Sequence, residues 1–104
     1  MSFYDRKGNH IEHFEVARLI EDPSYRVVKQ EDAPDGTYVS TVWLGIAHGF
    51  EGNKPRIFET MVFPIRGKWG EPLSCQRYCT EEEALKGHVA AMEERAKCAR
   101  KKLN

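Results

Sequence analysis

Two apolar stretches decide how this chain folds: residues 40–50 read STVWLGIAHGF, and residues 56–65 read RIFETMVFPI. Both are rich in β-branched and aromatic side chains, which favour strands. The loop that joins them, AHGFEGNKP, is shorter than the crossover of a dozen or more residues that parallel neighbours need. The pair therefore predicts two adjacent antiparallel strands.

Side-chain alternation places apolar residues on both faces of these strands. Val42 and Leu44 share one face of the first strand, and Trp43 lies on the other. In the second strand, Phe58 and Met61 lie on opposite faces. A strand with one solvated face is polar on that side. Both faces of this pair are therefore expected to be covered, at least in part.

The second apolar face has two possible explanations, and the sequence leaves both open. In the first, an N-terminal helix and the loop around Trp69 pack on it. In the second, Trp43, Phe58 and Trp69 form an exposed aromatic surface for self-association or for a protein partner, because exposed apolar patches mark interaction sites.

The remaining sequence predicts a short helix and two further strands. Apolar residues at helical spacing predict a helix over residues 10–21, with Asn9 as its N-cap. Residues that favour strands occur at 25–30 and again at 75–79. The Pro-Asp-Gly sequence at 34–36 predicts a tight turn, so the strand before it and the strand after it are expected to form a hairpin.

The last segment predicts a long helix. Thr80 and Glu83 have the spacing of a capping box, in which each side chain bonds the backbone amide of the other residue. Apolar residues then recur at steps of 4, 3, 4, 3 and 4, which predicts one apolar stripe packed on the sheet. The stripe contains Leu85, Val89, Met92, Ala96, Ala99 and Leu103.

These elements predict an α+β fold: a four-stranded antiparallel meander with a short N-terminal helix and a long C-terminal helix packed on it. The chain has 104 residues, which suits one domain. We expect a flexible N-terminus over residues 1–9 and a single domain over residues 10–104.

The composition excludes several classes of protein. The 16 basic and 16 acidic residues balance, so no overall charge favours nucleic acid or an anionic membrane. No apolar run approaches the roughly 18 residues of a membrane span, and the first residues do not read as a secretory signal. The three cysteines are an odd number, which favours reduced thiols in a cytoplasm over a disulfide scaffold.

Histidines and cysteines raise the question of a metal site or an enzyme. Cys75 and Cys79 on one strand would lie about 13 Å apart, too far to share a zinc ion. A nucleophile pair of Cys79 and His88, or a metal or catalytic site built on His48 and His88, can be imagined. The spacing favours neither, so we expect no metal, no cofactor and no catalytic residue.

Two surface segments could bind a partner. The loop AHGFEGNKP lacks the spacing of a phosphate-binding loop, but it is longer than a hairpin needs and can present His48 and Phe50. The basic end of the last helix carries Lys97, Arg100 and Lys101, which could contact nucleic-acid phosphates. No RNP-type aromatic motif accompanies these basic residues.

Three motifs in order carry a resemblance: TVWLGIAH at 41–48, IFETMVF at 57–63, and a final stretch, YCTEEEALKGH, at 78–88. Over residues 36–92 the chain resembles a family of small uncharacterised proteins from bacteriophages, prophages and actinobacteria. The family has aspartate before the histidine of the first motif, whereas this chain has Ala47 before His48. This departure argues against an activity carried by that Asp–His pair in this chain. The resemblance implies a phage or mobile-element context and supplies no catalytic residues.

We therefore expect a non-enzymatic accessory protein of a phage or mobile element, located in the host cytoplasm. It would bind either a host or phage protein or a second copy of itself as a homodimer. Inhibition of a host system is one outcome of binding a host protein. The binding residues would be Trp43, His48, Phe50, Phe58 and Trp69. The alternatives are nucleic-acid association through the basic helix end and a small metal or histidine enzyme.

Overall fold

The computed structural model describes the backbone of residues 1–103 and the side chains of residues 1–101. Its centre is a four-stranded antiparallel sheet in the order β3-β4-β7-β8, which confirms the predicted α+β class and the meander. The strands are β3 (Val27–Asp32), β4 (Tyr38–Trp43), β7 (Phe58–Phe63) and β8 (Ser74–Tyr78). The two apolar stretches form the central pair, with Trp43 opposite Phe58.

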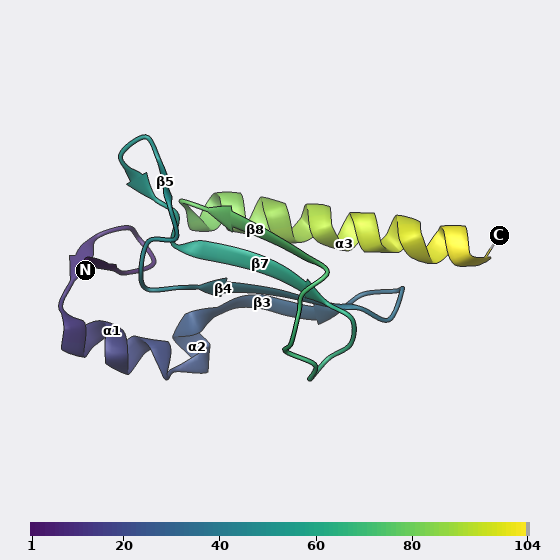
Figure 1. Cartoon of the computed structure of the whole chain (residues 1–104), viewed down its shortest axis with the longest axis horizontal. Helices are drawn as coiled ribbons and strands as arrows, with labels where there is room; N and C mark the ends of the chain where they lie inside the picture. Colours follow the sequence, from purple (N-terminus) through teal and green to yellow (C-terminus); the bar gives the residue numbers. More distant parts are fainter. Residues whose placement is uncertain (104) are drawn as a thin grey trace.

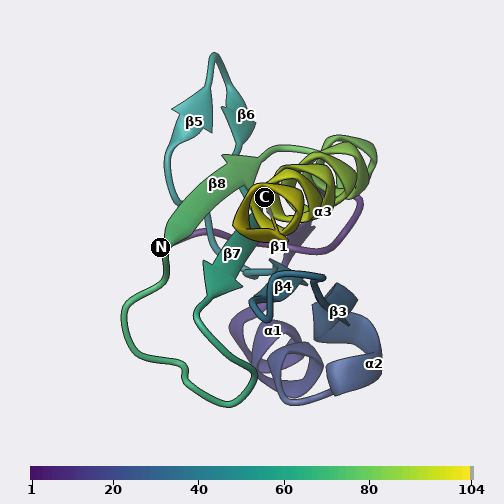
Figure 2. The same cartoon turned by 90° about the vertical axis from the view of Figure 1, so that its right-hand side faces the viewer.

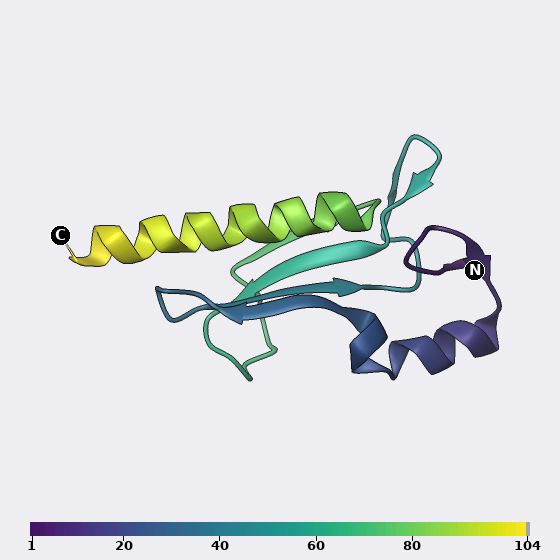
Figure 3. The ribbon, with the colours of Figure 1, turned by 180° about the vertical axis from the view of Figure 1, so that it is seen from behind.

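Helices lie on both sides of this sheet. The long helix α3 (Glu81–Leu103) runs along one face, and its C-terminal part extends past the end of the sheet (Figure 1). The short helices α1 (His13–Ile20) and α2 (Pro23–Arg26) lie on the other side, near the edge formed by β3 (Figures 2 and 3). The segment between β7 and β8 also lies on that side (Figure 2).

The N-terminal segment, predicted to be flexible over residues 1–9, contains a paired strand and one buried side chain. The strands β1 (Phe3–Tyr4) and β2 (His10–Ile11) pair with each other, and Tyr4 is buried. The Tyr4 carbonyl accepts a 3.0 Å hydrogen bond from Nε1 of Trp43. Because His10 and Ile11 pair as a strand, α1 begins at His13, after Glu12, and Asn9 is not its N-cap.

The loop between β4 and β7 contains a small hairpin of its own. Its strands are β5 (Phe50–Glu51) and β6 (Lys54–Pro55), and it projects from one end of the sheet (Figure 1). His48 precedes it and joins its base, because the His48 amide donates to the Arg56 carbonyl at 2.9 Å.

The start of α3 is as predicted, but only part of the predicted stripe faces the sheet: Met92 packs against a core cluster of Ala33, Val39 and Val62. The Glu83 amide donates to the Thr80 hydroxyl at 3.1 Å and the Thr80 amide donates to the Glu83 carboxylate at 3.1 Å, which confirms the capping box. Ala84 and His88 face the sheet and are fully buried. Leu85 and Val89, from the stripe predicted to be buried, are 40% and 51% exposed.

The helix turns its small residues to the sheet because β8 approaches it closely there. Gly87 leaves room for the Tyr78 ring, and a Cβ atom at position 87 would overlap the Tyr78 hydroxyl and Cζ. Ala84 packs into the main core cluster with Phe58 and Trp43. A larger residue at position 87 would hold the helix farther from β8, and the larger side chains Leu85 and Val89 lie on the flank of the helix.

Candidate functional site

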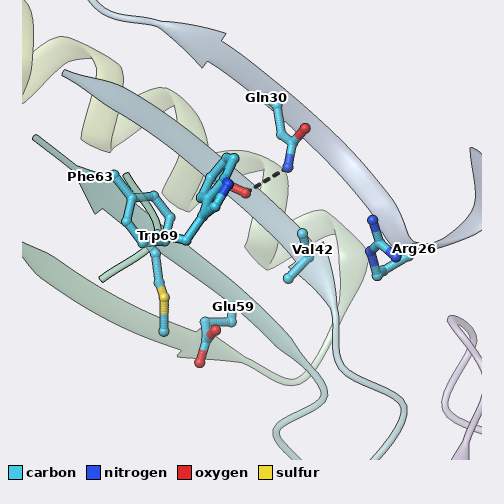
Figure 4. A pocket seen from close by; sticks show the side chains of 8 residues that line it. Arg26, Gln30, Val42, Glu59, Phe63 and Trp69 are labelled. Carbon is cyan, nitrogen blue, oxygen red and sulfur yellow. Dashed lines mark hydrogen bonds between the residues drawn. The ribbon is translucent and has the colours of Figure 1, made fainter. Parts of the chain in front are cut away.

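The face of the sheet opposite α3 contains an open cleft. At one end of this face, the exposed Trp69 ring packs edge-on against Phe63 and Tyr38, with ring centroids 5.0 and 5.6 Å away. At the other end, α2 contacts β3 and β4. The space between them is a cleft of about 240 Å³ (Figure 4). It is lined by Arg26, Gln30, Ser40, Val42, Glu59, Met61, Phe63 and Trp69.

This arrangement agrees in part with the first explanation for the apolar strand faces, whereas Trp43 and Phe58 do not form the exposed aromatic surface of the second. The Trp69 loop does pack on the face opposite α3, as the first explanation predicts, and α2 flanks it. The middle of the face is left open in the described structure, where Val42 and Met61 line the cleft. The apolar strand pattern therefore reflects a core on one face and a partly covered cleft on the other.

A neutralised acid forms part of the cleft lining. The Glu59 side chain is 9% exposed, and its Oε2 accepts a 3.0 Å hydrogen bond from Nε of Arg77. The Cys75 thiol lies 3.6 Å from the same oxygen. Burial, and then the neighbouring Glu59 carboxylate, raise the pKa of Cys75, so this thiol stays protonated at neutral pH. The Glu59 carboxylate thus already has a guanidinium partner and a thiol partner.

The other polar groups of the cleft are also engaged. Gln30 donates from Nε2 to the Ser40 hydroxyl at 2.9 Å, the bond drawn in Figure 4, and accepts from the Tyr38 hydroxyl at 3.0 Å. Arg26 donates to the Ile20 carbonyl at 2.8 Å. Because these polar groups have partners, the surfaces left for a ligand are mainly the side chain of Val42 and the aromatic rings of Phe63 and Trp69.

Trp43 and Phe58 are core residues, which corrects their prediction as binding residues. Both are fully buried, so neither side chain offers surface to a partner. They lie opposite each other on the face that α3 covers. The Tyr25 ring packs edge-on against Trp43 at 4.9 Å.

The other predicted binding residues lie at separate places. Trp69 is 57% exposed and lines the cleft. His48 is exposed and lines a different, polar cleft of about 370 Å³ with residues that include Arg56 and Arg77. Phe50 is 53% exposed in the small hairpin. The structure therefore does not gather the predicted residues into one surface.

His88 joins α3 to the sheet through a buried polar network. Its Nδ1 lies 2.8 Å from Oγ1 of Thr41, and its Nε2 lies 2.8 Å from a carboxylate oxygen of Glu31. Oγ1 of Thr41 is also 2.6 Å from Oγ1 of Thr60. An acid, a histidine and a hydroxyl in series resemble a nucleophile relay. Thr41 is fully buried and shared with Thr60, so a substrate has no access to its oxygen, and the network holds the helix on the sheet.

The remaining enzyme hypotheses have no supporting geometry. His48 is exposed and His88 is buried, and the two have different neighbours. The Cys79 thiol contacts the Lys54 carbonyl at 3.5 Å and a Glu51 carboxylate oxygen at 4.0 Å. Burial and then Glu51 raise the pKa of Cys79, which disfavours a thiolate nucleophile. Among the residues whose side chains are described, no three His, Cys, Asp or Glu form a metal-sized cluster.

The basic end of α3 is exposed. Lys97, Arg100 and Lys101 lie on its last described turns, where the helix extends past the sheet (Figure 3). Nucleic-acid binding by these residues stays a prediction. It would appear as a salt-dependent mobility shift of labelled DNA or RNA that is lost when the three charges are reversed. None of the helices in the described part of the chain is long and apolar enough to cross a membrane.

Most of the cleft cannot be recognised from the sequence, which nevertheless contains one signal of it. Ser40 and Glu59 interrupt the apolar pattern on the second face of the two central strands. A buried acid needs a partner, and the register places Arg77 opposite Glu59. The polar residues Ser40 and Glu59 on an otherwise apolar face are therefore the signal in the sequence that indicates the cleft.

Comparisons with protein-family models, curated proteins and solved structures gave no match to this chain. The resemblance to phage and actinobacterial proteins therefore stays a prediction.

Acid sensitivity is expected from Glu31. Its pKa is lowered, mainly by the hydrogen bond with His88 and also by the nearby Lys29 ammonium. A lowered folded-state pKa means that the unfolded chain binds the proton more readily. The stabilisation is therefore complete above the ordinary Glu pKa of about 4.3 and is lost as the pH falls through the folded-state value. Glu31→Gln should flatten the fall in the free energy of unfolding between about pH 5 and pH 3.

Urea unfolding at a series of pH values measures this effect. Glu94→Gln is the control, because Glu94 is an exposed carboxylate of α3. Glu94→Gln should leave the slope of the wild-type curve nearly unchanged. If the free energy of unfolding falls in parallel for the wild type and Glu31→Gln, the Glu31–His88 pair does not contribute to the loss of stability at low pH.

Proposed function

We propose that this protein is a small non-enzymatic binding protein whose cleft takes a large apolar or aromatic side chain of a partner protein. The observation that supports the proposal is the open middle of the second sheet face, between the Trp69 loop and α2. The face is filled at both ends and hollow between them.

The size and chemistry of the cleft favour a protein side chain over a small-molecule substrate. Its volume of about 240 Å³ is below the range of about 300–1,000 Å³ that is common for small-molecule pockets. One anchoring side chain in a pocket is typical of protein–protein hot spots. Glu59 is paired with Arg77, so this carboxylate is not free to bind a cation. Trp69, more than half exposed, extends the apolar wall to the surface.

The biological context of this proposal rests on the motif resemblance. A phage or mobile-element accessory protein in the host cytoplasm acts by occupying the surface of a host or phage protein, and inhibition of a host system is one outcome of such binding. Such binding requires a surface that can hold a partner side chain, and this chain has a partly apolar cleft on its sheet.

Small probes test whether the cleft binds such side chains. Indole, p-cresol and isobutanol imitate Trp, Tyr and Leu, and each is titrated into ¹⁵N-labelled protein while amide spectra are recorded. We expect saturable shifts of the Ser40, Val42 and Met61 amides. The variant Met61→Lys places a charged chain in the cleft and should abolish these shifts.

The matched control is Ile65→Lys, which makes the same kind of change at an exposed apolar residue that does not line the cleft. It should keep the probe shifts. The two variants then serve as baits in capture from host cells, where the partner should be retained by Ile65→Lys and lost by Met61→Lys. Shifts that map elsewhere, or that persist in a folded Met61→Lys variant, would contradict the proposal.

A further inference from the structure

The flank of α3 carries an exposed apolar seam. We use this name for Leu85, Val89, Met92 and Ala96, which follow one another at steps of 4, 3 and 4. Such steps are the spacing of a coiled-coil seam, narrower than the stripe that a helix usually turns to a core. Most of the seam lies beside the side that faces the sheet, which Ala84 and His88 occupy. Met92 also packs against a core cluster of Ala33, Val39 and Val62 and is only partly exposed.

A groove lies along this seam. It has a volume of about 300 Å³ and is lined by Glu31, Pro34, Val89, Met92, Glu93 and Ala96. Pro34, in the turn between β3 and β4, forms its far wall. Val89 is 51% exposed and Leu85 is 40% exposed. Side chains of another helix could enter this groove in the way that coiled-coil side chains enter the holes of a facing helix.

The charges of α3 favour a second α3 in the opposite direction. Its first turn carries Glu81, Glu82 and Glu83, and its last described turns carry Lys97, Arg100 and Lys101. Two parallel copies would place like charges side by side at both ends. Two antiparallel copies place the acidic end of each helix beside the basic end of the other, and complementary charges of this kind set the orientation of an interface.

We propose that two copies of this chain form a homodimer through their antiparallel α3 helices. In this pairing Leu85 lies opposite Ala96 of the second copy, and Val89 lies opposite Met92. Each contact occurs twice about a two-fold axis, as it must when both copies use the same surface. The seam from Leu85 to Ala96 spans about 16 Å of helix by the usual rise.

This dimer is independent of the proposed cleft function. The cleft is lined by side chains of the sheet face opposite α3, so pairing of the helices leaves both clefts open. A dimer would therefore present two binding sites to its partners.

Sedimentation velocity from about 10 μM to about 500 μM tests the proposal, since an interface of modest area assembles in that range. The wild-type mass should rise from that of one chain toward that of two. Val89→Glu puts a charge into the centre of the seam and should weaken dimerisation at least about 30-fold. Ala90→Glu is the control, because it adds the same charge at the next exposed position, off the seam, and should dimerise like the wild type.

Charge reversal tests the orientation. Glu82→Lys alone and Arg100→Glu alone should each weaken the dimer, and the double variant should restore it, because the exchanged charges are again opposite in the antiparallel arrangement. In a parallel pair the two positions do not meet, so no restoration follows. A wild-type protein that is monomeric throughout, a dimer unaffected by a folded Val89→Glu variant, or a double variant without restoration would each overturn the proposal.

Discussion

Replacing Trp43 with alanine is expected to lower the free energy of unfolding by about 3–5 kcal/mol. Trp43 is fully buried and contacts three separate parts of the chain. Its indole nitrogen donates to the Tyr4 carbonyl, its ring meets Tyr25 edge-on at 4.9 Å, and it packs with Phe58. Alanine would leave a cavity where the N-terminal hairpin, α2 and the sheet meet.

Denaturant unfolding followed by circular dichroism measures this loss, and the second tryptophan provides the control. Trp69 is 57% exposed, so Trp69→Ala should lower stability by less than about 1.5 kcal/mol. Trp43→Phe keeps a ring but leaves the Tyr4 carbonyl without its donor, which should lower stability by about 1–3 kcal/mol. If Trp43→Ala were no more destabilising than Trp69→Ala, the assignment of Trp43 to the core would be wrong.

The second large effect is expected at Gly87, where alanine should destabilise the protein by about 1–3 kcal/mol. In an ordinary helix interior the same change would be stabilising, by about 1 kcal/mol. Here the added methyl group would overlap the Tyr78 ring, which packs against the core beside α3. The close approach of helix and strand therefore reverses the usual sign of the substitution.

A double-mutant cycle isolates this contact. In the Tyr78→Ala background the obstructing ring is absent, so Gly87→Ala should become neutral or stabilising, with a favourable change of up to about 1 kcal/mol. Gly70→Ala is the control, because a Cβ atom at Gly70 would meet no atom within 4 Å. Its effect should stay within about 0.5 kcal/mol. Stabilisation by Gly87→Ala in the wild-type background would mean that the Tyr78 ring moves aside freely.

Local features of the chain could be predicted because they depend on neighbouring residues. The capping box needs only Thr80 and Glu83, and both of its bonds are present. The antiparallel pairing of β4 with β7 follows from a short loop between two runs of β-forming residues. The hairpin of β3 and β4 likewise follows from the turn at residues 34–36.

The candidate site was less predictable, since it depends on residues far apart in the sequence. His88 and Glu31 are 57 positions apart, and nothing in either local sequence indicates that they meet. The predicted helix at 10–21 failed at its start for a different reason: His10 and Ile11 pair as a strand with the nearby Tyr4 and Phe3, which apolar spacing alone does not reveal.

The sequence by itself determined the sheet, its direction and the presence of a long C-terminal helix, because periodicity, turn chemistry and capping act over a few residues. It also showed that both faces of the central strands are apolar. Only the tertiary structure decided that Trp43 and Phe58 lie under α3 while Val42 and Met61 line a cleft. Alternation separates two faces but does not say which one a helix will cover. The helix covers the face that carries Thr41 and Tyr78, where His88 reaches the Thr41 hydroxyl and Gly87 leaves room for the Tyr78 ring.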